Sequence, residues 1–174
     1  MDDHLYQLSQ RLGEQLLQRN WRIATAESCT GGGVAAAITA IPGSSAWFEY
    51  GIVSYANAAK EKLLGVSSET LAREGAVSET VVIEMARGVL ALSGADIAVA
   101  ISGVAGPSGG SVEKPVGTVW FAWVMATGEI KTELKYFDGD REKVQMQAVV
   151  WALEGLLNTS IHYQAELGNE KENK

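Results

Sequence analysis

Histidine, cysteine and long apolar runs are scarce in this chain of 174 residues, and each scarcity excludes a class of protein. The only two histidines are His4, near the start, and His162, in the polar last part of the chain. Catalysis in the core would have to work without histidine, which argues against a Ser-His-Asp triad, a Cys-His pair and a histidine-ligated metal. The single cysteine, Cys29, excludes an internal disulfide.

Positive charge is also limited. The 14 Lys and Arg against 21 Asp and Glu give a formal net charge of −7, which argues against nucleic acid or an anionic membrane as the main partner. No stretch resembles a signal peptide, and no apolar run is long enough to span a bilayer. We therefore expect a cytoplasmic protein, in which a local cluster of donors could still bind a small anion.

Apolar periodicity predicts an α/β fold. Leucines at helical spacing after Asp2-Asp3 indicate an amphipathic helix. The predicted helices cover 3–19, 33–40, 57–64, 68–74, 79–93 and 140–157, and the predicted strands cover 21–26, 51–55, 97–101, 116–126 and 130–137. We expect a single three-layer α/β/α domain over residues 1–159, with a mixed, mostly parallel sheet and an antiparallel hairpin at Thr127-Gly128. A polar, disordered tail is expected over 160–174.

The segment Glu27-Ser28-Cys29-Thr30-Gly31-Gly32 lies where the first strand turns into a helix. Ser28 or Thr30 could simply cap that helix. However, three successive glycines at a helix start cost roughly 1 kcal/mol each relative to alanine, which suits a backbone that a ligand approaches closely. Ser28 is the favoured nucleophile, and Cys29 is the alternative, although a lone cysteine is more often a small buried apolar group.

A lysine is the leading candidate for the base, because the core has no histidine. Lys60 follows the second strand in Tyr55-Ala56-Asn57-Ala58-Ala59-Lys60, among small apolar neighbours. Although a single lysine is usually a solvated surface residue, desolvation lowers a lysine pKa and allows it to act as a base. A Ser28–Lys60 pair is therefore the nucleophile and base that this chain could most readily assemble.

Two further segments could bind an anion. The loop 102–111, rich in glycine, follows the buried third strand, and its backbone N–H groups could cradle an anion or oxyanion; a flexible surface connection is the alternative. Arg141 begins the last helix, where the helix dipole disfavours a cation. Pairing with Asp138 or Asp140 would explain Arg141, and so would a ligand phosphate.

Four segments together carry a resemblance to a known family. They are Thr25-Ala26-Glu27-Ser28-Cys29-Thr30-Gly31-Gly32, Tyr55-Ala56-Asn57-Ala58-Ala59-Lys60, Ile101-Ser102-Gly103-Val104-Ala105-Gly106-Pro107 and Lys114-Pro115-Val116-Gly117-Thr118-Val119. In this order, from about residue 5 to 157, the chain resembles the CinA C-terminal domain family, in its stand-alone amidase form. The resemblance implies hydrolysis of nicotinamide mononucleotide (NMN) to nicotinate mononucleotide and ammonia, in pyridine-nucleotide recycling.

The resemblance also implies roles for residues. The catalytic set would be Ser28, Lys60 and Tyr55. The substrate-binding set would be Glu27, Cys29, Thr30, Gly31, Gly32, Asn57, Ser102, Gly103, Ala105, Gly106 and Arg141. The resemblance implies that the protein needs no metal or cofactor. It also implies a homo-oligomer. The alternative is a nucleotide-binding or regulatory module that keeps the fold without the chemistry.

Overall fold

The computed structural model describes the backbone of residues 1–172 and the side chains of residues 1–163. In chain order the elements are α1 (Asp3–Arg19), β1 (Ile23–Glu27), α2 (Gly33–Thr39), the 3-10 turn η1 (Ser44–Ala46), β2 (Phe48–Val53), α3 (Asn57–Leu64), α4 (Ser68–Glu74), α5 (Glu79–Ser93), β3 (Ile97–Gly103), β4 (Thr118–Met125), β5 (Ile130–Tyr136) and α6 (Arg141–Glu172). The predicted order of helices and strands is confirmed.

A single five-stranded sheet, with strand order β2-β1-β3-β4-β5, forms the middle of the fold. Strand β1 pairs in parallel with both β2 and β3, whereas β4 pairs antiparallel with β3 and with β5. The predicted mixed sheet and its hairpin are therefore confirmed. Four of the strands run in one direction, and β4 alone runs in the opposite direction. Because β4 lies between β3 and β5, two of the four strand pairings are antiparallel and two are parallel.

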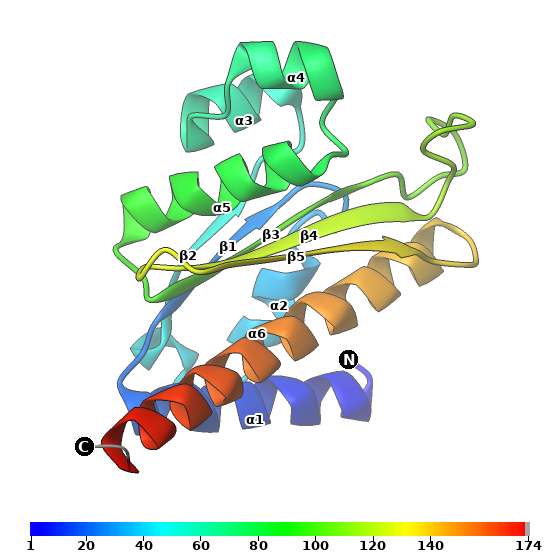
Figure 1. The fold of residues 1–174 in the computed structure, drawn as a ribbon. Helices are drawn as coiled ribbons and strands as arrows, with labels where there is room; N and C mark the ends of the chain where they lie inside the picture. Colours follow the sequence, from blue (N-terminus) through cyan, green and yellow to red (C-terminus); the bar gives the residue numbers. More distant parts are fainter. Residues whose placement is uncertain (173–174) are drawn as a thin grey trace.

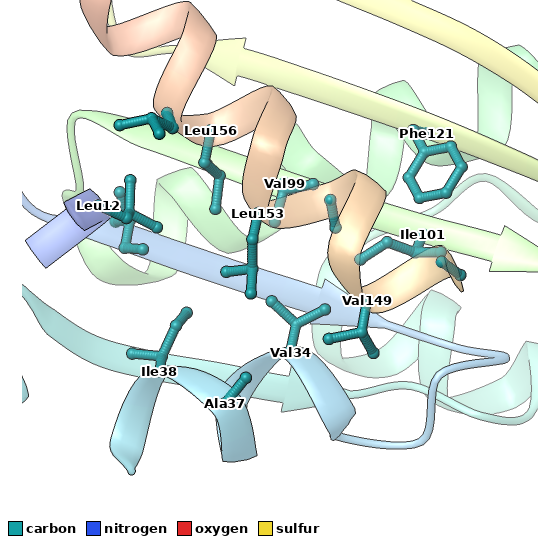
Figure 2. Close-up of a cluster of buried hydrophobic side chains, with 14 of the residues drawn as sticks. Leu12, Val34, Ala37, Ile38, Val99, Ile101, Phe121, Val149, Leu153 and Leu156 are labelled. Atoms are coloured by element: carbon teal, nitrogen blue, oxygen red, sulfur yellow. The ribbon is translucent and has the colours of Figure 1, made fainter. Parts of the chain in front are cut away.

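Helices cover both faces of the sheet, as the predicted three-layer fold requires. Figure 1 shows α3, α4 and α5 on one face and α1, α2 and α6 on the other. The α6 face is filled by large aliphatic and aromatic side chains, among them Leu12, Ile38, Phe121 and Leu153 (Figure 2). Fully burying a side chain of this size contributes about 1.5–3 kcal/mol, so this layer holds much of the stability.

The opposite face of the sheet is lined with small residues. Ala24, Ala26, Ala98 and Ala100 alternate with the large residues of the same strands and pack beneath α5. Because side chains alternate between the two faces of a strand, β3 is buried on both, as its continuous apolar sequence predicts. The same alternation continues into the residue that directly follows a strand. It therefore decides toward which layer of helices the side chains at the ends of the strands point.

Helix α6 is longer than predicted. It continues beyond Leu157 to Glu172, where the sequence analysis expected a disordered tail. The reason is packing: Ser160 is buried and its hydroxyl donates to the Leu157 carbonyl at 2.8 Å, while the Tyr163 ring lies 5.2 Å from the Trp21 ring. Residues 160–163 are therefore helical and packed against the rest of the fold, and residues 173–174 lie outside the described residues.

Within the described part of the chain, none of the helices has the length and apolar character needed to cross a bilayer.

Candidate active site

The candidate site lies at the carboxyl ends of β1, β2 and β3. Ser28 directly follows β1, and its backbone N–H donates to the Ile101 carbonyl of β3 at 2.9 Å, which extends the ladder by one residue. In the alternation of β1, Ala24 and Ala26 face α5, so Ser28 also faces the α3–α5 side. Glu27 and Cys29 fall in the opposite phase, toward α2 and α6.

Lys60 reaches Ser28 from helix α3. It is four residues before Leu64, so the two side chains share the inner face of the helix, and both are buried. Only 1 % of Lys60 is exposed. Its Nζ lies 2.9 Å from Ser28 Oγ, 2.8 Å from the Ser54 carbonyl and 3.3 Å from the Tyr55 carbonyl. Burial lowers the pKa of Lys60, because desolvation disfavours the ammonium form.

The partners of Lys60 can be satisfied by a neutral amine as well as by an ammonium group, which would donate to all three. Carbonyl oxygens can only accept, so Lys60 donates two N–H groups to Ser54 and Tyr55. A neutral lysine has two such hydrogens and one lone pair, and the third contact is a hydroxyl, which can donate to that lone pair. The arrangement can therefore take a proton from Ser28 Oγ.

Cys29 does not share this arrangement. It borders the same cavity, but it belongs to the buried cluster on the α6 side. Burial raises the pKa of its thiol to about 12, so the thiol is protonated at neutral pH. Its backbone carbonyl accepts a hydrogen bond from Gln145 Nε2 of α6 at 3.0 Å. Of the two neighbours, only Ser28 has a hydrogen-bond contact with Lys60.

Glu27 has a role that sequence reasoning missed. Its buried carboxylate accepts hydrogen bonds from Val34 N at 2.8 Å, Ala35 N at 3.1 Å and Thr30 Oγ1 at 2.7 Å. Glu27 therefore satisfies the N–H groups of the second and third residues of α2, and neither the Ser28 nor the Thr30 side chain is the cap. This bonding fixes the turn that carries Ser28.

The glycines of this turn also have a structural reason. Gly31 and Gly32 have positive φ angles of 60° and 100°, which side chains disfavour. A Cβ on Gly33 would come within 2.8 Å of Val149 on α6. Four predicted site residues do not line the cavity, and their contacts with substrate stay predictions: Glu27, Thr30, Gly31 and Gly32.

Arg141 closes the site from the start of α6. Its Nη1 donates to the Gly106 carbonyl and its Nη2 to the Tyr55 hydroxyl, each at 2.8 Å. Among the described residues, no ion pair joins it to Asp138 or Asp140, so that explanation is wrong. The guanidinium is held by neutral groups and keeps its charge available to a ligand.

These residues surround a cavity of about 400 Å³. The predicted site residues that line it are Ser28, Cys29, Tyr55, Asn57, Lys60, Ser102, Gly103, Ala105, Gly106 and Arg141. Five further residues line the cavity without having been named individually as site residues: Ala76, Val77, Val104, Ser108 and Gly109. Val104, Ser108 and Gly109 belong to the glycine-rich loop 102–111, which the sequence already indicated as a binding segment. Ala76 and Val77 precede α5, and no local pattern indicates them.

In the part of the chain that the structure describes, no group of three or more His, Cys, Asp or Glu side chains is placed to hold a metal.

Comparisons with known proteins identify the family of the chain. The family model described as the CinA C-terminal domain matches residues 5–160. The chain is 57% identical over 155 residues to nicotinamide-nucleotide amidohydrolase PncC of Escherichia coli (strain K12), covering 89% of this chain and 94% of that protein. It is 54% identical over 160 residues to the protein of the same name from Enterobacter agglomerans, covering 92% and 98%.

The fold is similar to a solved structure as well. The crystal structure of the CinA superfamily protein from Klebsiella pneumoniae 700603 superposes with a TM-score of 0.87 at 47% identity, covering 91% of this chain and 98% of that one. With the family match over most of its length, the chain belongs to the CinA C-terminal domain family.

Proposed function

We propose that this protein hydrolyses the carboxamide of nicotinamide mononucleotide, producing nicotinate mononucleotide and ammonia. The relatives at 54% and 57% identity carry the name nicotinamide-nucleotide amidohydrolase, which supports this substrate. The observation that carries the proposal is the 2.9 Å contact between the buried Lys60 Nζ and Ser28 Oγ.

In the proposed mechanism, neutral Lys60 takes the proton of Ser28 Oγ while that oxygen attacks the carboxamide carbon. The carbonyl electrons move to oxygen, and the resulting oxyanion is held by N–H and O–H donors. When the oxyanion collapses, the C–N bond breaks, and the nitrogen leaves as ammonia with the proton from Lys60. Water, deprotonated by Lys60, then attacks the acyl carbon of the Ser28 ester. The C–Oγ bond breaks, and Ser28 Oγ leaves with the proton from Lys60, which regenerates both groups.

The opposite end of the substrate would bind Arg141 and the loop 102–111. The phosphate of NMN is an anion, and the Arg141 guanidinium has no carboxylate partner among the described residues. Tyr55 would act beside the dyad, since its hydroxyl is bound to Arg141 and its carbonyl to Lys60. Asn57, which lines the cavity, would contact the substrate between these ends.

The finer predictions extend this proposal. The reaction needs neither metal nor cofactor, and its product, nicotinate mononucleotide, would enter NAD recycling. We also propose that the protein works in the cytoplasm as a homo-oligomer. The alternative, a nucleotide-binding or regulatory module without catalysis, would retain affinity for NMN without turnover.

The test is ammonia release from NMN by the wild type and by Ser28→Ala, Lys60→Ala and Lys62→Ala. Lys62 is an exposed lysine of the same helix and is the matched control. We expect Lys60→Ala to lower kcat by about 10²–10⁴-fold, Ser28→Ala to abolish turnover, and Lys62→Ala to leave it unchanged. Full turnover by Ser28→Ala would reject the mechanism. Calorimetric binding of NMN without turnover by the wild type would favour the alternative module.

A further inference from the structure

We propose that the Ser102 hydroxyl is a catalytic oxyanion donor, which stabilises the negative oxygen formed when Ser28 attacks an acyl carbon. This inference rests on the proposed function in taking Ser28 as the nucleophile. It begins with the register of the sheet. Glu27 pairs with Ile101, and the Ser28 N–H donates to the Ile101 carbonyl at 2.9 Å, so the next residues side by side are Ser28 and Ser102.

The two serines also share a face of the sheet. Ser102 continues the phase of Ala98 and Ala100, which pack beneath α5, just as Ser28 continues the phase of Ala24 and Ala26. The antiparallel partner of Ser102 is Trp120, which packs against the same cluster. Both hydroxyls therefore lie on the α5 side, and both residues line the cavity.

Lys60 and Ser102 flank Ser28 from opposite sides. The carbonyls that hold Lys60, of Ser54 and Tyr55, follow β2, whereas Ser102 belongs to β3, and β1 lies between these two strands. An acyl group on Ser28 Oγ thus has the base on one side and Ser102 on the other. This separation suits two tasks, proton removal and charge stabilisation, performed by different groups.

The hydroxyl of Ser102 is free to donate. Ser102 is only 1 % exposed, and none of the hydrogen bonds among the described residues uses its hydroxyl. Buried serines in the helices differ: Ser9 donates to the Leu5 carbonyl at 2.9 Å and Ser160 to the Leu157 carbonyl at 2.8 Å. The Ser54 hydroxyl is also unpaired, but Ser54 does not line the cavity.

The Lys60 and Arg141 side chains already donate hydrogen bonds to other groups of the protein. Lys60 donates to two carbonyls and directs its remaining position to Ser28 Oγ, and the Arg141 guanidinium bonds Gly106 and Tyr55. A neutral hydroxyl has one hydrogen to give, and an oxyanion accepts it more strongly than the ground-state carbonyl oxygen does. Ser102 would therefore lower the barrier without tightening substrate binding to the same extent.

The experiment measures acylation of Ser28 with two acyl donors, NMN and p-nitrophenyl acetate. With the ester, Ser28 Oγ forms the new C–O bond, Lys60 takes its proton and p-nitrophenolate leaves, so the step needs no NMN recognition. The variants are Ser102→Ala, Ser102→Cys with its weaker S–H donor, and Ser28→Ala for background. The control is Ser45→Ala, an exposed serine of η1 that does not line the cavity.

We expect Ser102→Ala to lower the ester acylation rate and the kcat for NMN by on the order of 10²-fold, with KM within about twofold. The rates of Ser102→Cys should fall between those of Ser102→Ala and the wild type, and the rates of Ser45→Ala should match the wild type. Unchanged rates in folded Ser102→Ala, or a raised KM at unchanged kcat, would overturn the inference. If the ester acylates the wild type but NMN is not turned over, only the proposed substrate is overturned. The inference about Ser102 is then judged by the ester acylation rate of Ser102→Ala. No acylation of Ser28 by either donor would overturn both.

Discussion

The Arg141 guanidinium donates a hydrogen bond to the Tyr55 hydroxyl at 2.8 Å and joins the start of α6 to the loop after β2. Its other nitrogen bonds the Gly106 carbonyl, so one side chain connects three segments that are distant in the sequence. Both partners are neutral. A planar guanidinium can hold two such acceptors and still present a positive charge to the cavity.

Replacing Arg141 should therefore weaken substrate binding more than chemistry. Arg141→Lys retains the charge but cannot bond Tyr55 and Gly106 in the same fork geometry, and Arg141→Ala loses both. We expect KM for NMN to rise about tenfold in Arg141→Lys and more in Arg141→Ala, since a charged hydrogen bond is worth about 1.5–3 kcal/mol. Lys143→Ala, in the same helix turn, is the control, and an unchanged KM in Arg141→Ala would contradict phosphate binding by this residue.

Glu27 should matter for stability. Glu27→Ala would leave the N–H groups of Val34 and Ala35 and the Thr30 hydroxyl without their acceptor in a buried turn. We expect the free energy of unfolding in urea to fall by about 2–4 kcal/mol. The exposed Glu142→Ala should change it by less than about 0.5 kcal/mol. Equal stability of the two variants would show that the Glu27 bonds contribute nothing net.

Cys29 should be dispensable. Because burial raises the pKa of its thiol to about 12, the reactive thiolate is scarce at neutral pH. Cys29→Ala should keep kcat for NMN within a few-fold of the wild type. Iodoacetamide should modify the native protein slowly and the urea-unfolded protein quickly, as mass spectrometry of the Cys29 peptide would reveal. If alkylation of Cys29 in the native protein abolished turnover, and Cys29→Ala were also inactive, Cys29 would be the nucleophile.

The pH dependence of turnover should report Lys60. Burial lowers the pKa of Lys60 below the ordinary lysine value of 10.5, and only the neutral amine can take the Ser28 proton. The kcat/KM for NMN should therefore rise with pH and level off once the pH exceeds this lowered pKa. Lys62→Ala should leave the profile unchanged. A rise that continues to the ordinary lysine range would contradict a desolvated base.

The same shift has a consequence for stability. Between the lowered pKa of folded Lys60 and the ordinary value of about 10.5, the unfolded chain binds more protons at this site than the folded chain. The Lys60 contribution to the free energy of unfolding should therefore increase with pH across that window. Urea unfolding at several pH values should show this increase in the free energy of unfolding for the wild type. The increase should be absent from Lys60→Met.

Much of this site could be predicted from the sequence, because the needed signals were local. Ser28 and Lys60 each follow a strand, and the lack of core histidine left a lysine as the leading base. The alternation of β1 decides between Ser28 and Cys29, yet its phase relative to the helices is a property of the packed fold. The sequence could thus name both residues without saying which one faces Lys60.

Other features depend on contacts between distant segments and could not be predicted. Arg141 has aspartates as sequence neighbours, but the docking of α6 directs it to Tyr55 and Gly106. The glycine run suggested close approach by a ligand, whereas at Gly33 the approaching group is Val149 of α6. The extension of α6 likewise depends on Trp21, far away in sequence, which contacts Tyr163.

The most direct test of the account is to trap the acyl-enzyme. NMN is mixed with the protein, the reaction is quenched in acid within milliseconds, and the Ser28 peptide is analysed by mass spectrometry. We predict a nicotinate mononucleotide ester on Ser28 in the wild type, far less in Lys60→Ala and none in Ser28→Ala. The same adduct on Cys29, or turnover at the wild-type rate by Ser28→Ala, would contradict the Ser28–Lys60 mechanism.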